Sequence, residues 1–461
     1  PVTISYGDVL MMEVNDTYLV ASATPKYLIF TVPNSLSSYY LNGIGWTVSY
    51  NQNIFYNYTF CPALVSGSNN QLVFYALNKD PDLSSRDNQL FLLLKKIVTG
   101  TNDNRDLNTT RRILERIFKL INKHNKLLLP DNLFINGSIC PDEELEKSIK
   151  SLQVGEALVS NSLLIAVKLS EKEAQSFNYS DFSSYKSIAY AGSFIKITYP
   201  EDLFSLNDAE LRKDFNLLTT GRTSAKISAS NTILGNNFFA EEGASAECAT
   251  FNTLEGPIYL AKNSQVWEGS HIRGSFALGE HSQVKMGGKI YGATTIGPHC
   301  RVGGEVNNSI LFAYSSKGHE GFLGNSVLGE WCNIGADTNN SNMKNNYSEV
   351  RLWDYAKQSF RKTGLQFCGL IMADHAKCGI NTMFNTGTVV GVSCNIFGSG
   401  FPRNFVPDFS WGGAHGFETY GLNKAFEVAE KVFERRGMDF NQVEKDILTA
   451  VFEQTEGFRK Y

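Results

Sequence analysis

The sequence predicts an α/β region followed by a parallel β-helix of hexapeptide repeats, and three observations lead to this prediction. Aliphatic residues recur every six positions without a slip from Leu260 to Val302. Most of them are followed, four positions later, by a small or β-branched residue, and a glycine often comes directly after the aliphatic residue. The chain has 461 residues, which at roughly 150 residues per domain corresponds to two or three domains.

Composition excludes classes of function. The net charge is −4, with 42 basic and 46 acidic residues, so no global field attracts nucleic acid or an anionic membrane. No stretch approaches the roughly 18 apolar residues of a membrane span. The start at Pro1 lacks the basic flank and apolar run of a signal peptide, and indicates a processed chain or a fragment. Eight cysteines without a CxxC pair favour reduced thiols in a cytoplasmic protein.

Residues 1–124 form a first segment without an assigned function. Residues 1–84 alternate short apolar runs with Pro, Gly, Asn and Ser, which is typical of short strands and turns. Residues 108–125 are expected to form a helix capped by Asn108 or Thr109. One face of this helix is basic, and is read either as a solvated surface or as a site for phosphates.

Residues 125–224 show an α/β pattern. A strand is expected at Phe134, and a short acidic helix after Pro141. Residues 157–169 are expected to form a hairpin that turns at Ser160-Asn161-Ser162. A further helix is expected to begin with Asn207 or Asp208 as its cap.

Residues 225–413 carry the six-residue period. After Val302 the period resumes at Phe322 and again at Met372, which makes sixteen hexads, or about five coils. Six residues turn a helix through well over one and a half turns, so the period excludes a helix, and it matches one hexad per face of a three-sided prism. Two insertions are expected, at 308–321 and 340–371, and residues 414–461 are expected to form two amphipathic helices.

Two long stretches carry a resemblance to a known family. They are GATTIGPHCRVGGEVNNSILFAYSSKGHEGFLG, from residue 292, and TGLQFCGLIMADHAKCGINTMFNTGTVVGVSC, from residue 363. With residues 134–160 and 202–224, they resemble GlmU-type enzymes, which are bifunctional N-acetylglucosamine-1-phosphate uridyltransferases and glucosamine-1-phosphate N-acetyltransferases. The closer match is the variant branch found in Bacteroidetes. Residues 1–124 are not matched.

The resemblance implies a left-handed β-helix and an acetyl-CoA-dependent N-acetyltransferase. Its substrate would be an amino-sugar-1-phosphate, within nucleotide-sugar biosynthesis in the cytoplasm. The flat, largely uncharged prism walls lead us to expect a homotrimer, and in the family the acetyl site lies between subunits. Neither the nucleotide loop nor the metal-binding Asp of the uridyltransferase half can be carried over, so we expect that activity to be weak or absent, with Mg²⁺ needed only if it survives.

The resemblance also assigns site residues. An attacking amine must lose a proton, and a histidine titrating near neutral pH suits this task. The family's catalytic histidine matches His319. Arg301 and Lys317 are expected to bind the sugar phosphate, because a dianion needs cationic partners. Asn342 matches a substrate-binding asparagine. The coenzyme A region of the family covers Asp374 and His375.

Other interpretations stay open. The chain could be a sugar-1-phosphate nucleotidyltransferase whose β-helix only oligomerises it, or a non-enzymatic trimeric scaffold. A metal site is not expected, because zinc needs three or four ligands and only His281 and His299 recur at a useful spacing. These two histidines are 18 residues apart, or one coil, and are expected to stack on each other.

Overall fold

The computed structural model describes residues 131–177 and 181–461 in full, and the backbone of strands between residues 9 and 76. Five of these strands form an antiparallel sheet in the order β1-β2-β3-β7-β6, and β4 and β5 form a hairpin. The basic helix expected at 108–125 lies outside the described residues. The bounds are β1 Val9–Val14, β2 Thr17–Thr24, β3 Tyr27–Thr31, β4 Trp46–Tyr50, β5 Ile54–Tyr58, β6 Phe60–Ser66 and β7 Gln71–Ala76.

The chain divides into two compact units. The first contains residues 1–98, 107–196 and 436–439, and the second contains residues 99–106, 197–435 and 440–461. In the first unit a four-stranded sheet has the order β12-β10-β11-β8, and β13 pairs with β9. Its strands and helices are β8 Asp131–Ile135, β9 Ile139–Cys140, α4 Glu143–Lys150, β10 Glu156–Ser160, β11 Leu163–Ser170, α5 Glu171–Gln175, β12 Lys186–Ala189 and β13 Ile195–Lys196.

Two local predictions in this unit are confirmed. Strands β10 and β11 pair antiparallel, and their turn places Asn161 and Ser162 at φ +45° and +70°. Helix α4 begins after Pro141, where the Asp142 carboxylate accepts the backbone N–H of Leu145 at 2.9 Å. This contact satisfies one of the free N–H groups at the helix start.

Helix α6, Asp202–Thr219, begins earlier than the expected caps Asn207 and Asp208. Both residues lie inside the helix. Tertiary contacts use their side chains instead: the Asn207 amide donates to Ala293 O at 2.8 Å, and Asp208 accepts from the Ser275 hydroxyl. The cap prediction was wrong because a polar residue that bonds across the fold has the same sequence signature as a cap.

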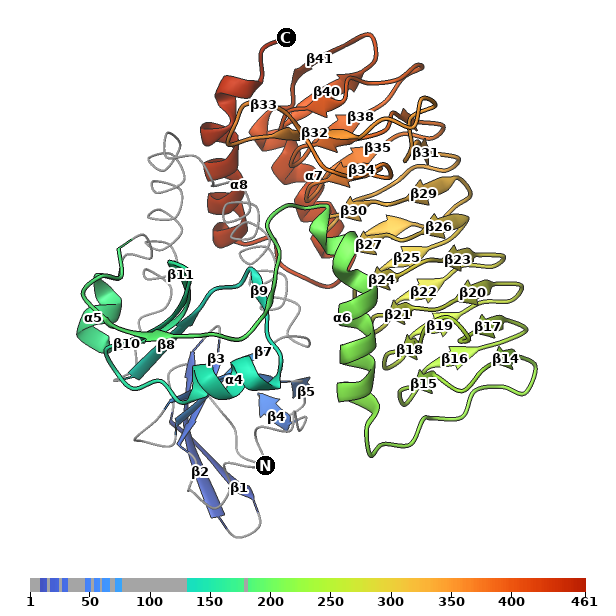
Figure 1. Cartoon of the computed structure of the whole chain (residues 1–461). Helices are drawn as coiled ribbons and strands as arrows, with labels where there is room; N and C mark the ends of the chain where they lie inside the picture. The colour runs from blue at the N-terminus through green and yellow to red at the C-terminus, as the bar shows by residue number, and fades with distance from the viewer. Residues whose placement is uncertain are drawn as a thin grey trace. The chain divides into compact units, whose positions relative to one another are not determined.

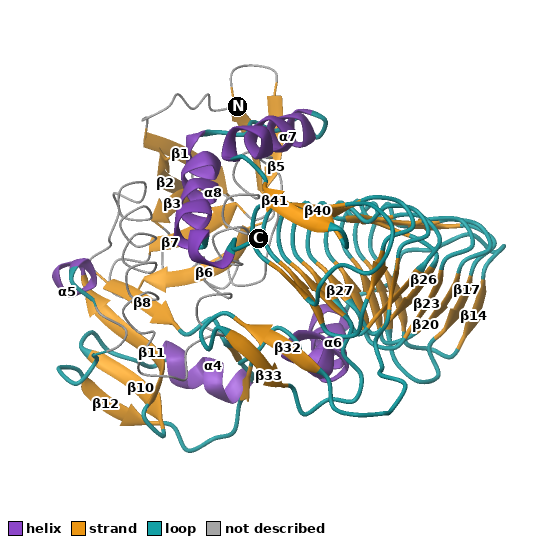
Figure 2. Cartoon of the chain, turned by 90° about the horizontal axis from the view of Figure 1, so that it is seen from above, coloured by secondary structure: helices purple, strands orange, loops and turns teal. Residues whose placement is uncertain are grey.

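The second unit is built on a left-handed parallel β-helix of about ten turns (Figure 1). Its coils stack on one another, and the strands of successive coils pair to form three walls (Figure 2). The first wall contains β14 Thr232–Leu234, β17 Thr250–Asn252, β20 His271–Arg273, β23 Lys289–Tyr291, β26 Glu305–Asn307 and β29 Phe322–Gly324, and β31 Asn339–Asn340 and β36 Met383–Phe384 form a further pair.

The second wall contains β15 Phe238–Ala240, β18 Ile258–Leu260, β21 Phe276–Leu278, β24 Thr294–Ile296, β27 Ile310–Leu311, β30 Val327–Leu328, β34 Leu370–Met372, β37 Thr388–Val390 and β39 Phe405–Val406. The third wall contains β16 Ser245–Ala246, β19 Gln265–Val266, β22 Gln283–Val284, β25 Arg301–Val302 and β28 Ser316–Lys317, then β35 Lys377–Cys378, β38 Asn395–Ile396, β40 Ser410–Gly413 and β41 Gly416–Thr419.

The buried interior confirms the hexad prediction, but the β-helix has about ten turns and not the expected five. The aliphatic residues from Leu260 to Val302 are buried in one continuous core. Residues 308–321 are not an insertion, because they form β27 and β28 in a shorter coil. Val302 pairs with Lys317, fifteen residues on, whereas Val284 pairs with Val302, eighteen residues on. After this shortening Leu323, and not Phe322, occupies the inward position opposite Val306.

Residues 340–371 do leave the coil, as expected. They contain a hairpin of β32 Arg351–Asp354 and β33 Ser359–Lys362. One side of the hairpin packs on the second wall through Leu352, which shares a hydrophobic cluster with Phe204 of α6 and Val389. The hairpin and α6 therefore cover the outer face of the second wall.

The two expected C-terminal helices are α7 Leu422–Glu434 and α8 Gln442–Gln454, followed by the short 3-10 helix η2 Glu456–Phe458. Phe433 of α7 stacks at 4.3 Å on Trp331, which belongs to a column of rings along one corner of the β-helix. The column contains the expected stack, because the His281 and His299 rings lie 5.1 Å apart at 15°. These corner residues all have φ near +58°, so they occupy the left-handed turn of their coils.

Candidate functional site

His319 lies at the corner between the third and first walls, where the chain passes from β28 to β29. Its side chain is exposed, and none of the described side chains hydrogen-bonds to its imidazole. The preceding Gly318 lies against Arg301, since a Cβ on Gly318 would be 3.8 Å from the Arg301 Cβ. An exposed imidazole at this corner can take the proton of an amine that is bound there.

The outer face of the third wall places a second cation, Lys285, near Arg301. Gln283 pairs with Arg301 in adjacent strands, and Lys285 follows two residues later on the same face. Its Nζ lies 3.7 Å from the centre of the Trp267 ring and donates to Gln283 at 2.9 Å. Burial and the positive charge of Arg301 both lower the pKa of Lys285. Two cations that repel each other in this way favour an anion bound between them.

The Arg301 guanidinium is held by two backbone carbonyls. Its NH1 donates to His281 O at 3.0 Å and to Cys300 O at 2.9 Å. These bonds fix the side chain along the corner that carries the histidine column. This corner joins the second and third walls, so the guanidinium is held at the end of the third wall away from His319. Lys285 on the same outer face was not singled out by the sequence pattern.

Lys317 does not fit its expected role in binding phosphate. It takes the inward position of the third wall opposite Val302, and only 1% of its surface is exposed. Its ammonium donates to Gly303 O at 3.0 Å and to His319 O. A cation enclosed by the coil and bonded to carbonyls cannot reach a sugar phosphate outside. Its effect on the site is to hold the backbone of the His319 corner.

The enclosed Lys317 should make stability depend on pH. Burial lowers its pKa from the ordinary 10.5 to about 8, and the charges of Glu320 and Asp337 offset only part of this effect. Between pH 8 and 10.5 the unfolded chain keeps a proton on Lys317 that the folded chain has lost. The free energy of unfolding therefore rises with pH in this range, and the enclosed lysine destabilises the fold most below pH 8. Between pH 8 and 10.5 the free energy of unfolding of wild type should rise by about 3 kcal/mol more than that of Lys317→Met, which lacks the titrating group.

Urea unfolding at a series of pH values measures this difference. The control is Lys289→Met, because Lys289 is about half exposed and pairs with Glu320 at 3.2 Å. Equal pH dependence in wild type and Lys317→Met would show that the pKa of Lys317 is the same in the folded and the unfolded chain, and that enclosure in the coil does not lower it.

Asn342 lies at the far end of the first wall from His319. Its Nδ2 donates to the Asn325 side chain at 2.8 Å, near the corner between the first and second walls. A wall of six residues separates the two corners, which is roughly 20 Å of extended chain. Within one chain the structure therefore does not bring Asn342 to His319.

Asp374 and His375 lie at the third corner, between the second and third walls. They are 7% and 4% exposed. Asp374 accepts the backbone N–H of Glu330 at 2.8 Å, and His375 stacks near Phe433 with centroids 6.1 Å apart. These contacts make the pair part of the packing beneath α7, so their expected contact with coenzyme A does not fit the structure. The same burial, with the charges of Asp374 and Glu444, raises the pKa of Glu330.

Neither a metal cluster nor a membrane helix occurs in the described part of the chain. Among residues 131–177 and 181–461, no three His, Cys, Asp or Glu side chains gather as metal ligands would. Within the same ranges, no helix combines the length and the apolar character required to cross a membrane.

Comparison with known proteins finds one matching family and several similar solved structures. Residues 95–223 match a family described as sugar nucleotidyl transferase. No curated protein matches the chain. The polysialic-acid-specific acetyltransferase NeuO is a similar solved structure, with 14% identity, a TM-score of 0.24, and coverage of 42% of this chain and 86% of its own.

Two further solved structures are similar to this chain. The Arabidopsis UDP-N-acetylglucosamine acyltransferase has 15% identity and a TM-score of 0.22, and the match covers 50% of this chain and 91% of that one. A variant of AntD, an N-acyltransferase from Bacillus cereus in complex with dTDP-4-amino-4,6-dideoxyglucose and coenzyme A, has 12% identity and a TM-score of 0.19. That match covers 44% of this chain and 91% of AntD.

Proposed function

We propose that this chain is an acetyl-CoA-dependent N-acetyltransferase that acts on an amino-sugar-1-phosphate. The observation that carries the proposal is the exposed imidazole of His319 at one end of the third wall, whose outer face carries the two cations Lys285 and Arg301. The pair suits the phosphate of the acceptor, and the histidine suits its amine. The resemblance of residues 292–394 to GlmU-type acetyltransferases supports the same assignment, and the free cysteines of the described ranges are in keeping with a cytoplasmic location.

The reaction needs no covalent enzyme intermediate. The amine nitrogen of the acceptor attacks the thioester carbonyl carbon of acetyl-CoA, and the carbon–sulfur bond breaks as the new carbon–nitrogen bond forms. The His319 imidazole takes the proton that the amine loses, and the coenzyme A thiolate leaves and is protonated. Lys285 and Arg301 hold the phosphate, so the amine is presented in a fixed orientation.

The separation of Asn342 from His319 is the reason to propose a homotrimer. A threefold assembly could place the Asn342 corner of one subunit beside the His319 corner of the next, as the family resemblance implies. We expect a single species of three times the chain mass in sedimentation equilibrium at micromolar concentration. A monomer that retains full acetyltransferase activity would contradict both the trimer and the shared site.

Two parallel incubations test the proposal against its alternatives. The chain is incubated with acetyl-CoA and glucosamine-1-phosphate, and separately with UTP, Mg²⁺ and N-acetylglucosamine-1-phosphate. We expect acetylated product and free coenzyme A in the first, and little or no UDP-sugar in the second. The match of residues 95–223 to sugar nucleotidyl transferases keeps the second reaction as an alternative. Product only in the second would replace the proposal, and product in neither would favour a scaffold.

A further inference from the structure

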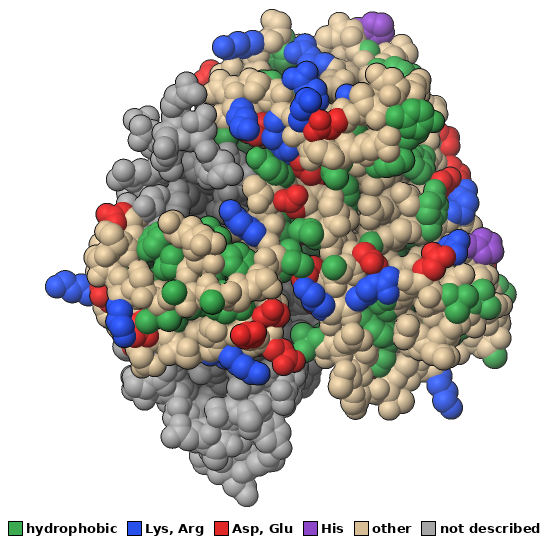
Figure 3. Space-filling view, in the orientation of Figure 1, with side chains coloured by type: hydrophobic (Ala, Val, Ile, Leu, Met, Phe, Trp, Pro, Cys, Tyr) green, Lys and Arg blue, Asp and Glu red, His purple; other side chains and the backbone are tan. Residues whose placement is uncertain are grey.

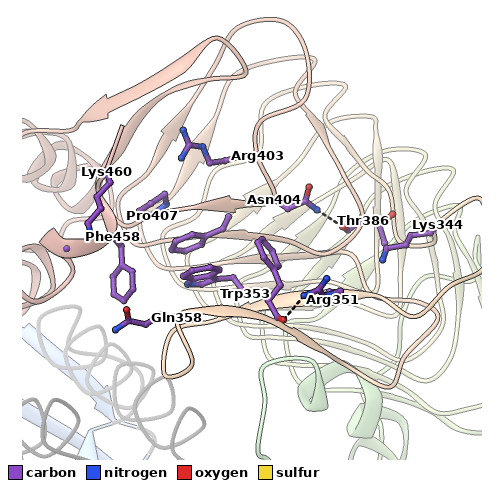
Figure 4. A pocket seen from close by; sticks show the side chains of 13 residues that line it. Lys344, Arg351, Trp353, Gln358, Thr386, Arg403, Asn404, Pro407, Phe458 and Lys460 are labelled. Carbon is purple, nitrogen blue, oxygen red and sulfur yellow. Dashed lines mark hydrogen bonds between the residues drawn. The ribbon is translucent and has the colours of Figure 1, made fainter. Parts of the chain in front are cut away.

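A second concave site lies on the C-terminal coils, away from the His319 corner. It is a pocket of about 850 Å³ between the hairpin β32–β33, the segment that leads into β39, and the end of η2 (Figure 4). Its volume falls within the roughly 300–1,000 Å³ of pockets that enclose small organic ligands. The pocket was not foreseen from the sequence beyond the expectation that residues 340–371 leave the coil.

Four cations line this pocket, and no acidic side chain lines it. They are Lys344, Arg351, Arg403 and Lys460. Figure 3 shows Lys and Arg side chains gathered at this end of the β-helix. Two of the four are oriented by backbone carbonyls, because Lys344 donates to Glu349 O at 2.9 Å and Arg351 donates to Phe360 O at 3.0 Å. In the described part of the chain no carboxylate pairs with any of the four, so the pocket keeps a positive charge.

Four aromatic rings form the other part of the lining. Trp353 stacks on Phe405 with centroids 4.2 Å apart at 10°, and Phe360 meets Trp353 edge-on at 5.4 Å. Phe458 of η2 approaches the same group edge-on, 6.2 Å from Phe405. The Trp353 Nε1 is buried and has no hydrogen-bond acceptor among the described residues. A buried donor without a partner carries a cost that a polar ligand can remove.

The hairpin directs these groups into the pocket by strand alternation. Trp353 pairs with Phe360 across the two strands, and Arg351 is two residues before Trp353, so all three share one face. On the opposite face the Arg361 guanidinium forms a bidentate ion pair with Glu201. The hairpin is therefore anchored to the body of the second unit from behind, and its ligand-facing side is held in place.

We infer that this pocket binds a nucleoside carrying two or more phosphate groups. The rings offer stacking for a base, which is worth about 1–3 kcal/mol for each stacked base. The four cations match a polyphosphate, with the two guanidinium groups able to bind phosphate oxygens bidentately. A simple sugar phosphate would leave the rings unused, and a neutral aromatic ligand would leave the cations unused. The inference does not rest on the acetyl-transfer proposal, because the pocket and His319 lie on different corners.

Two sources of such a ligand are distinguishable by titration calorimetry on the full chain. UDP represents a nucleotide-sugar, and coenzyme A represents an acyl donor with its phosphorylated adenosine. Uridine and inorganic pyrophosphate each supply only half of the required chemistry. We expect UDP or coenzyme A to bind at least about tenfold more tightly than either half, since each half forgoes more than 1.4 kcal/mol of contacts.

Variants locate the binding. Arg351→Ala and Arg403→Ala should each weaken the binding of UDP or coenzyme A by about 10–100-fold, as expected for loss of a charge-assisted hydrogen bond. Lys362→Ala is the matched control, because Lys362 is on the same hairpin, is 78% exposed and pairs with Glu349 outside the pocket. Trp353→Phe keeps an aromatic ring at this position and removes the buried N–H donor, and should weaken the binding of UDP or coenzyme A.

The outcomes separate clearly. Binding of neither compound, or affinities in Arg351→Ala and Arg403→Ala equal to those of Lys362→Ala, would overturn the inference. If one arginine variant does not fold, Lys344→Ala takes its place in the comparison. His319→Ala should bind the nucleotide like wild type, so failure of the acetyl-transfer proposal and failure of this inference give different results.

Discussion

Replacing His319 with alanine is expected to lower kcat for acetyl transfer about 10²–10⁴-fold at pH 7. The side chain is exposed at a corner, so its removal costs little packing, and the affinity for acetyl-CoA and the assembly should stay nearly unchanged. The loss should shrink at high pH, where the acceptor amine is already deprotonated and needs no base. Steady-state kinetics of wild type and variant from pH 6 to 10 measure both effects.

The matched control is His271→Ala, because His271 is another exposed histidine, on β20 of the first wall. It should retain wild-type kinetics. Full activity of His319→Ala at pH 7 with an amino-sugar acceptor would remove the imidazole from the mechanism. A uniform loss at every pH would indicate that His319 positions the substrate and does not take its proton.

The second large effect concerns the anchor of the hairpin. The Arg361 guanidinium binds both carboxylate oxygens of Glu201, lies 3.4 Å from Asp354, and covers the Tyr199 ring at 3.5 Å. The three charged side chains are between 3% and 8% exposed. Arg361→Ala leaves two carboxylates buried without their cation, so we expect the free energy of unfolding to fall by about 3–5 kcal/mol.

Chemical denaturation measures this loss. Arg273→Ala is the control, since Arg273 forms an ion pair of similar geometry with Glu255, but both side chains are more than half exposed. Its effect should stay within about 1 kcal/mol because solvent screens such pairs. Equal effects of the two substitutions would show that the Arg361 cluster is solvated and does not hold the hairpin. If the hairpin is held by this cluster, Arg361→Ala should also weaken nucleotide binding in the pocket.

The candidate site was only partly predictable. His319 and Arg301 were both found from the sequence. The backbone before His319 passes the Arg301 Cβ, but the Arg301 guanidinium is bound at the other end of the third wall, where it donates to His281 O. Lys285 was missed, although it immediately follows the inward Val284, at a position that a hexad exposes. Lys317 was predicted to lie on the surface. The shortened coil shifts the register and places it inside instead. Burial is decided by which residues pair across coils, and the charge of a side chain does not reveal that pairing.

The sequence by itself determined the β-helix, the β10–β11 hairpin, the C-terminal helices and the His281–His299 stack. Each of these follows from local periodicity or from a spacing of one coil, so neighbouring residues carry the information. Only the tertiary structure decided the number of coils, the burial of Asp374 and His375, and the pocket around Trp353. These depend on contacts such as that between Glu201 and Arg361, which are 160 residues apart. No local pattern encodes such contacts, because they arise only once the coils have stacked and the hairpin has packed against them.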